Sequence, residues 1–175
     1  MSCSSLVFRR PIPDDYERVM AVLPSWWDGR EPAAVVPPVF FEHFRTTSLL
    51  VEHEERLVAF LVGFFCHDHA GEAYVHFAGV APEWRRVGLG RDLYRRFCTL
   101  ARAAGREVVC CVTAPADAAS VAFHTALGFS MAASGEVVDG LPVVAARGPG
   151  GEPRVRFELR LGAEPAALVR PEAGA

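Results

Sequence analysis

The chain has 175 residues, of which 51% are hydrophobic and 22% are charged, a composition typical of a globular protein and not of a disordered one. Its formal net charge of −3 argues against general affinity for nucleic acid or for an anionic membrane surface. A run of about 18 uncharged apolar residues, which would predict a membrane span, does not occur. Arg9 and Arg10 follow the apolar residues 6–8, which is the reverse of the order in a signal peptide, so we expect a cytoplasmic protein.

The first half of the chain predicts strands and helices separated by a proline-rich segment. The expected elements are a strand over 6–10, a helix from Asp14 or Asp15 to Leu23, a short helix over 39–45, and strands over 48–52, 56–65 and 72–81. Either aspartate could cap the first helix. The segment 24–38, with its Trp26-Trp27-Asp28-Gly29 turn, is expected to be a long loop.

After Pro82 the hydrophobic period changes to that of a helix. An apolar stripe (Leu89, Leu93, Phe97, Leu100 or Ala101, and Ala104) predicts an amphipathic helix that ends at Gly105. The later elements expected are a buried strand over 107–112, a helix over 117–127 closed by Gly128, and strands over 130–138 and 154–161. This order predicts a single mixed α/β domain over 1–161 and a loose tail over 162–175.

The cysteines give no metal or disulfide pattern. The five thiols are odd in number and lack a Cys-x-x-Cys spacing (Cys3, Cys66, Cys98, Cys110 and Cys111). We expect them to be reduced and buried, because a free cysteine packs as a small hydrophobic residue. No metal site is expected.

The segment Arg85-x-x-Gly88-x-Gly90 lies between a predicted strand and a predicted helix. Glycines there allow close approach of a ligand to the backbone, and the N–H groups at a helix N-terminus point towards an anion. Arg85 and Arg86 add two planar guanidinium groups. The pattern predicts an anion site, although a simple glycine-assisted turn would also explain it. It is neither a Walker loop nor a full dinucleotide fingerprint.

Two segments together resemble one enzyme superfamily. Val80-x-Pro82-x-Trp84-Arg85-Arg86-x-Gly88-Leu89-Gly90 resembles the pyrophosphate-binding signature of the GNAT N-acetyltransferases, and Asp117-x-x-Ser120-x-x-Phe123-His124-x-x-Leu127-Gly128-Phe129 resembles their second signature. The resemblance implies a mixed, mostly antiparallel sheet of about seven strands, splayed between the fourth and fifth strands and flanked by about four helices. It also implies an acetyltransferase that uses acetyl-CoA.

The resemblance further implies where the cofactor binds. The pantetheine arm would pair with the fourth strand, and the pyrophosphate would meet the following helix N-terminus. The cofactor-binding residues implied are Ala78, Gly79, Val80, Arg85, Arg86, Val87, Gly88, Leu89, Gly90, Arg91, Asp117, Ser120 and Phe123. Asp117 stands where the family usually has Asn, so a helix N-cap is the alternative role for it.

The transfer needs a neutral amine and a proton for the leaving thiolate. Strand alternation predicts that Tyr74, His76, Ala78 and Val80 share one face. His76 resembles a histidine that some members of the superfamily carry on this strand, and it is the candidate base; a packed strand histidine is the alternative. Tyr74 stands where others carry a glutamate, for which it is a poor substitute.

His124 replaces the tyrosine that usually provides the acid. Asp117, Ser120 and His124 share one helix face by spacing, whereas Ala119, Phe123, Ala126 and Leu127 are expected to face the core. His124 could protonate the thiolate, or only hydrogen-bond the cofactor while the thiolate leaves unassisted.

The acceptor is indicated only weakly. Trp26 and Trp27, with Phe40, Phe41 and Phe44, could line an aromatic pocket for an amine, with Asp28 or Glu72 attracting the ammonium group. The aromatic residues could equally form core or a dimer surface. We expect a small-molecule amine as substrate, with a protein N-terminal or lysine amine as the alternative, and possible homodimer formation. A non-catalytic acyl-CoA-binding module is the other class of function that the sequence leaves open.

Overall fold

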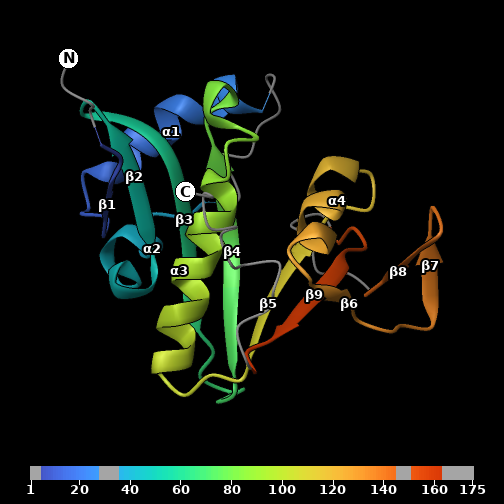
Figure 1. The fold of residues 1–175 in the computed structure, drawn as a ribbon. Coiled ribbons are helices and arrows are strands. Elements are labelled where there is room, and N and C mark those ends of the chain that lie inside the picture. The colour runs from blue at the N-terminus through green and yellow to red at the C-terminus, as the bar shows by residue number, and fades with distance from the viewer. Residues whose placement is uncertain (1–4, 28–35, 145–150, 163–175) are drawn as a thin grey trace, which may run out of the picture. The chain divides into compact units, whose positions relative to one another are not determined.

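A seven-stranded mixed sheet forms the centre of the fold, with the strand order β1-β2-β3-β4-β5-β9-β6 (Figure 1). The computed structural model describes residues 5–27, 36–144 and 151–162. The strands are β1 (Val7–Arg9), β2 (Leu49–His53), β3 (Arg56–Phe65), β4 (Glu72–Val80), β5 (Val108–Thr113), β6 (Ser130–Met131), β7 (Glu136–Val138), β8 (Leu141–Val143) and β9 (Val155–Arg160). The helices are α1 (Asp15–Trp26), α2 (Val39–Glu42), α3 (Leu89–Ala103) and α4 (Ala118–Ala126), with 3-10 turns at Arg45–Thr47 and Pro82–Trp84.

The predicted mixed fold is confirmed. β4 and β5 are parallel, and their pairing joins Glu72–Tyr74 to Val108–Cys110. The pairs β1–β2, β2–β3, β5–β9 and β6–β9 are antiparallel.

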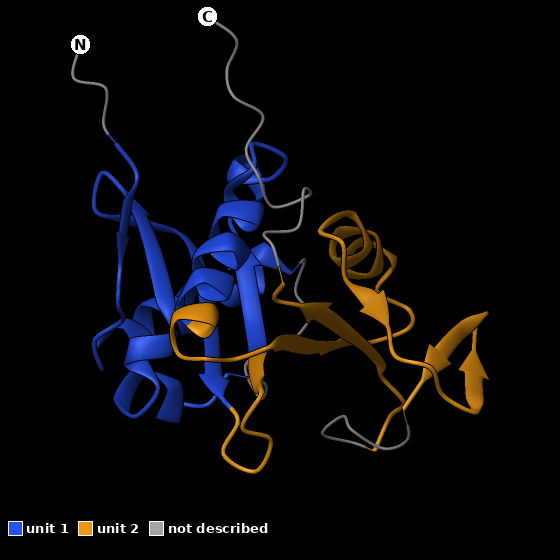
Figure 2. Cartoon of the chain, turned by 60° about the horizontal axis from the view of Figure 1, so that its bottom comes forward, with its two compact units in different colours: residues 1–65, 75–100 blue, residues 66–74, 101–175 orange. Residues whose placement is uncertain are grey.

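The chain divides into two compact units, coloured separately in Figure 2. Unit 1 comprises residues 1–65 and 75–100, and unit 2 comprises residues 66–74 and 101–175. The proposed tail over 162–175 lies almost entirely outside the described residues. Among those residues, every helix is too short or too polar to cross a lipid bilayer.

In unit 1, helices pack on both faces of the strands. The core on one face combines α1, α2, β2 and β3 through Val19, Leu23, Trp26, Phe40, Phe41, Leu50, Phe60 and Val62. On the other face, α3 buries the predicted stripe of Leu89, Leu93, Phe97 and Ala101. Phe97 meets Phe65 of β3 with 6.4 Å between ring centroids. Ala104, the last residue of the predicted stripe, is exposed beyond the helix end.

A β-bulge interrupts β4. The Ala81 N–H donates to Val58 O at 2.9 Å, and the Cys66 N–H donates to Glu72 O at 3.0 Å. Between these two hydrogen bonds the chain advances nine residues from Glu72 to Ala81 but only eight from Val58 to Cys66, so the β4 side has one extra residue. The extra residue lies at His76–Phe77, because these neighbours both contact aromatic rings of the α1–α2 side, His76 meeting Phe40 and Phe77 meeting Trp27. The prediction that His76 shares a face with Ala78 and Val80 is therefore wrong.

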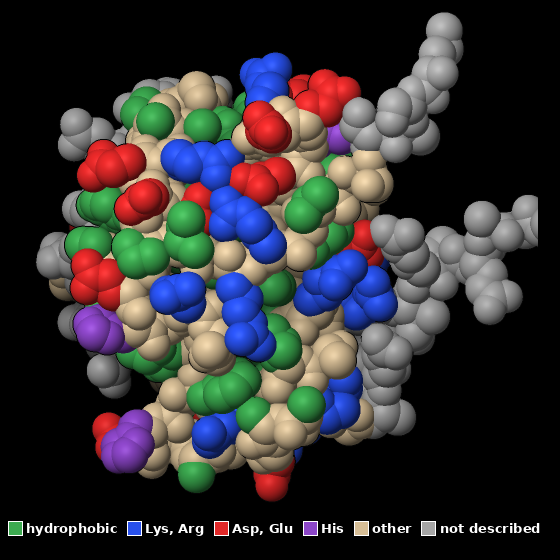
Figure 3. Space-filling model, turned by 90° about the vertical axis from the view of Figure 1, so that its left-hand side faces the viewer, with side chains coloured by type: hydrophobic (Ala, Val, Ile, Leu, Met, Phe, Trp, Pro, Cys, Tyr) green, Lys and Arg blue, Asp and Glu red, His purple; other side chains and the backbone are tan. Residues whose placement is uncertain are grey.

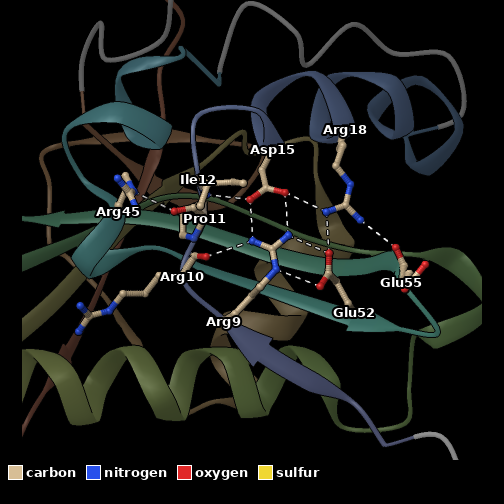
Figure 4. Close-up of polar contacts among 9 residues, drawn as sticks. All are labelled: Arg9, Arg10, Pro11, Ile12, Asp15, Arg18, Arg45, Glu52 and Glu55. Atoms are coloured by element: carbon tan, nitrogen blue, oxygen red, sulfur yellow. Dashed lines mark hydrogen bonds and ion pairs between the residues drawn. The ribbon is translucent and has the colours of Figure 1, made fainter.

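A buried charge network joins β1, α1 and β2 in unit 1 (Figure 4). The Arg9 guanidinium donates to Asp15 at 2.6 Å and to Glu52 at 2.8 Å, and Arg18 donates to the same two carboxylates at 2.9 and 2.6 Å. Asp15 is only 1% exposed, and it accepts the Ile12 N–H at 2.8 Å. Burial alone would raise the pKa of Asp15, but the hydrogen bonds from Arg9, Ile12 and Arg18 outweigh it and lower that pKa to about 2. Neither Asp14 nor Asp15 caps α1 in the predicted way.

Unit 2 is built on β5, β9 and β6. β9 pairs antiparallel with both neighbours, and α4 follows β5. The predicted single strand over 130–138 is wrong: β6 ends at Met131, and β7 forms a separate hairpin with β8. The turn residues Asp139 and Gly140 both have positive φ (51° and 78°), as a two-residue Asp-Gly hairpin turn requires.

The cysteines differ in burial. Cys98, Cys110 and Cys111 are buried, as expected, whereas Cys66 is only half-buried. Burial raises the pKa of Cys110 to about 12, although its sulfur lies 3.2 Å from the Arg156 guanidinium. Cys3 lies outside the described residues.

Candidate active site

The loop between β4 and α3 exposes a row of backbone N–H groups. Arg86 and Gly88 have positive φ values of 64° and 91°, and the chain turns there into α3. The first backbone bond of the helix runs from Asp92 N–H to Gly88 O at 3.0 Å, so the preceding N–H groups of 88–91 have no acceptor within the helix. Residues 85–88 are exposed, and Val87 is 66% exposed. This geometry suits an anion at the helix N-terminus.

The two adjacent arginines of this loop face different groups. The Arg85 Nε donates to Val80 O at 3.1 Å, and its NH2 group donates to Trp26 O. Arg86 is exposed. Arg85 therefore binds backbone carbonyls of unit 1, whereas Arg86 presents its charge to solvent.

The end of β4 is packed tightly against α1. A Cβ atom at Gly79 would lie 2.5 Å from the Trp27 ring and 2.8 Å from the Phe60 ring, distances that a side chain cannot adopt without movement. The Trp27 and Phe77 ring centroids are 5.1 Å apart. Gly79 therefore points to the α1 side, which leaves Ala78 and Val80 on the other face of β4.

The histidine of β4 lies against an aromatic ring. His76 is half-buried and stacks on Phe40, with 4.7 Å between centroids and 26° between planes. Tyr74, two residues earlier, belongs to unit 2 and pairs with Cys110 of β5. Burial raises the pKa of Tyr74 to about 12, so its hydroxyl keeps its proton at neutral pH and is no base there.

Helix α4 turns its histidine inwards. His124 is 6% exposed and stacks on Phe157 of β9 at 5.1 Å and 26°, whereas Ala119 and Ala126 are exposed. The predicted core face is therefore wrong for Ala119 and Ala126, whereas Leu127 is buried as predicted. Phe123 is half-buried and meets the His124 ring edge-on at 5.4 Å.

The hydrogen bonds of α4 determine the state of that histidine. The Nδ1 atom of His124 lies 2.8 Å from Ser120 O, and a carbonyl can only accept, so Nδ1 carries the hydrogen. In the neutral ring Nε2 then has no proton to donate. Burial lowers the pKa of His124, which favours this neutral form. Asp117 is the N-cap of α4 and accepts the Ser120 N–H at 3.0 Å, as the alternative interpretation predicted.

The candidate acceptor residues differ in their surroundings. Trp26 and Phe41 are buried in the core of unit 1, where Trp26 stacks on Phe60 at 5.9 Å. Trp27 is half-buried over β4. Glu72 lies in unit 2 and accepts from the Arg156 guanidinium at 3.1 Å. Asp28 lies outside the described residues. Core packing thus explains Trp26 and Phe41, and an ion pair partly neutralises Glu72.

Residues 13–129 match a family model described as "Acetyltransferase (GNAT) family". The chain belongs to the GNAT family of acetyltransferases. No curated protein sequence is significantly similar to it.

Solved structures share the fold of this acetyltransferase. A protein from Desulfovibrio desulfuricans assigned to the GNAT family superposes with a TM-score of 0.73 at 20% identity over 90% of this chain and 100% of that one. Diaminobutyrate acetyltransferase EctA from Paenibacillus lautus, in complex with its substrate and coenzyme A, gives 0.64 at 20% identity over 89% and 94%. Ribosomal-protein-S18-alanine N-acetyltransferase from Escherichia coli gives 0.62 at 15% identity over 98% and 99%. The TM-scores establish the common fold. The sequence identities of 15–20% leave the acceptor of this acetyltransferase open.

Two features of the acetyltransferase were absent from the sequence prediction. One is the contact of Arg85 with Trp26 O, because the two residues are 59 positions apart in the chain. The other is an open cavity of about 610 Å³ in unit 1, lined by segments of α1, the β2–β3 turn and the Pro82–Trp84 turn, including Trp26, His53, Glu83 and Trp84. Within the described part of the chain, no cluster of three His, Cys, Asp or Glu side chains could hold a metal ion.

Proposed function

We propose that this protein transfers an acetyl group from acetyl-CoA to the primary amine of a small molecule, by direct attack in a ternary complex. The observation that carries the proposal is the exposed loop before α3. It combines positive-φ residues, helix N–H groups without intrahelical acceptors and an outward Arg86, in a chain that belongs to an acetyltransferase family.

The described residues fit acetyl-CoA as the donor. The N–H groups of 88–91 and the Arg86 guanidinium would hold the pyrophosphate. The pairing of β4 with β5 covers Glu72–Tyr74, and the backbone of Ala78–Val80, which follows that pairing along β4, would pair with the pantetheine amides. Acetyl-CoA supplies the thioester, whose carbonyl accepts negative charge during attack and is stabilised by backbone donors.

His76 is the proposed base. An alkylammonium with a pKa near about 10.4 must lose a proton before it can attack, and a half-buried imidazole can accept that proton directly or through water. The Phe40 ring holds the imidazole plane, which limits its rotation. The bulge at His76–Phe77 sets this side chain apart from Ala78 and Val80, so a water relay is the route we favour.

His124 is proposed to position α4 and to take no part as an acid. Its buried neutral ring has its one N–H committed to Ser120 O, so it has no proton for the thiolate near neutral pH. The coenzyme A thiolate would then leave unassisted. Tyr74 is the other candidate on β4 for an acid–base role. Its hydroxyl keeps its proton up to a pH of about 12.

For the acceptor, Trp27 is the aromatic candidate that the core does not fully bury. A small amine agrees with this limited apolar surface. Acetylation of a protein amine is the second candidate, as in the related fold of the ribosomal-protein acetyltransferase. Cytoplasmic localisation and dimer formation remain predictions, the latter tested by sedimentation of the purified chain.

The experiment is an assay of coenzyme A release over a panel of small amines and N-terminal peptides, preceded by calorimetric titration of acetyl-CoA. We expect binding and turnover with at least one small amine. Turnover with peptides alone would overturn the small-molecule assignment, and acetyl-CoA binding without turnover in either panel would favour a binding module.

A further inference from the structure

Arg85 connects the loop before α3 to the last turn of α1. Its Nε donates to Val80 O at 3.1 Å, and its NH2 group donates to Trp26 O, all within unit 1. Trp26 is the last residue of α1, and its carbonyl is one of the four at that end without an intrahelical donor. A cation at a helix C-terminus also interacts favourably with the helix dipole.

The α1 end that Arg85 holds is packed on β4. Trp27 follows Trp26 directly, and its ring lies 5.1 Å from Phe77 and against Gly79. The Trp26 ring stacks on Phe60. One guanidinium thus joins the loop and the end of β4 to the end of α1, where Trp26 is followed by Trp27.

We propose that Arg85 is a positioning residue that couples occupancy of the loop by acetyl-CoA to the conformation of the α1 end, and so to Trp27, the aromatic candidate for the acceptor site. Of the two arginine side chains, only that of Arg86 contributes to anion binding, together with the N–H groups of 88–91. The proposal rests on the proposed function, because acetyl-CoA is the ligand that would occupy the loop.

The coupling has its physical basis in the hydrogen bonds of Arg85, which would have to break if the loop and the α1 end moved independently. The backbone of Arg85 is fixed by its own N–H bond to Pro82 O at 3.3 Å, and its side chain bridges two carbonyls from separate elements. An anion that orders the loop therefore also orders the Trp26 carbonyl. Removal of the guanidinium frees the α1 end while the N–H groups of 88–91 stay in place.

The tryptophans provide the readout. The protein has three of them, Trp26, Trp27 and Trp84, so in a Trp84→Phe background the fluorescence reports on the α1 end alone. Acetyl-CoA is titrated with excitation at the red edge of tryptophan absorption, where adenine does not absorb, and affinity is measured in parallel by calorimetry.

Arg85→Gln and Arg86→Gln form a matched pair in that background. We expect Arg85→Gln to lose most of the fluorescence change at saturation while its Kd stays within about threefold, and Arg86→Gln to keep the change while its Kd rises about tenfold through the loss of one charge-assisted contact. In turnover, Arg85→Gln should raise the KM of the amine more than that of acetyl-CoA. Arg85→Lys should recover part of the fluorescence change, because an ammonium can reach one of the two carbonyls.

An unaltered fluorescence change in Arg85→Gln, with acetyl-CoA bound, would overturn the positioning role. A tenfold loss of affinity in Arg85→Gln equal to that of Arg86→Gln would show a direct phosphate ligand instead and would also overturn it. Absence of any heat with acetyl-CoA in the unsubstituted protein would overturn the proposed function itself.

Discussion

His76 and His124 both stack on a phenylalanine at an angle of 26°, yet their surroundings differ. His76 is half-buried over Phe40 on a bulged strand of unit 1, whereas His124 is almost fully buried over Phe157 in unit 2 and donates to Ser120 O. Ring contact alone therefore does not distinguish a reactive imidazole from a packed one. Exposure does: His76 is half-buried, whereas His124 is 6% exposed.

The strongest test of this difference is His76→Ala. If His76 removes the proton from the amine, kcat/KM should fall by roughly 10²–10⁴-fold, while the thermal midpoint changes little. His69→Ala, an exposed histidine of the 66–71 loop, is the matched control and should retain full turnover. Equal rates for His76→Ala and the unsubstituted enzyme would remove His76 from the mechanism.

His124→Ala should affect stability in place of chemistry. Loss of a buried ring and its hydrogen bond should lower the free energy of unfolding by about 2–3 kcal/mol in a urea titration, with His43→Ala, an exposed histidine, as the control. His124→Phe should keep the packing and most of the turnover. A fall in kcat of a hundredfold in His124→Phe, without loss of stability, would restore the acid role.

The same histidine gives a pH signature. Burial lowers its pKa in the folded state, so the stability it contributes is present above its unfolded pKa of about 6.5 and decreases as the pH falls below that value. This dependence should be absent in His124→Phe.

In unit 1 the corresponding buried ionisable group is Asp15, which is charged where His124 is neutral. Its folded pKa of about 2 lies below the ordinary aspartate value of 3.8, so its contribution is present above pH 3.8 and is lost as the pH falls to about 2. The expected size is about 2 kcal/mol. Asp15→Asn should remove that dependence in acid unfolding; an unchanged acid transition in this variant would show that the network in Figure 4 does not control acid stability.

The smallest expected effect concerns the cap of α4. Asp117→Ala should cost about 1 kcal/mol of unfolding free energy, whereas Asp117→Ser should restore most of it, because a hydroxyl can also accept the Ser120 N–H. If Asp117 instead contacts the cofactor, Asp117→Ala would weaken acetyl-CoA binding more than it destabilises the protein. Calorimetry and urea titration on the same samples separate the two.

Local requirements were predictable from the sequence, and long-range pairing was not. Gly88 and the start of α3 follow from backbone geometry that a few neighbouring residues determine. The inward turn of His124 depends on Phe157, 33 positions later, and the bulge in β4 depends on its pairing with β3. The β7–β8 hairpin is different, because the Asp139-Gly140 pair between two valine-rich segments is a hairpin signal that the sequence itself contains. The predicted strand over 130–138 did not take this turn into account.

The face of the protein shown in Figure 3 carries side chains of both charges, in agreement with the small net charge of −3. On the face shown in Figure 3, hydrophobic side chains are separated by arginine and carboxylate groups. Since all 18 cationic side chains are arginines, the charge on this face cannot be altered by lysine acetylation.

The contact between Gly79 and Trp27 also limits how the enzyme could be engineered for new acceptors. A library that varies position 79 alone would return mostly unfolded or displaced variants, because every side chain there meets the indole. Shortening Trp27 first would make room at position 79. The two positions should therefore be randomised together, and accepted combinations should show an inverse relation between their side-chain volumes.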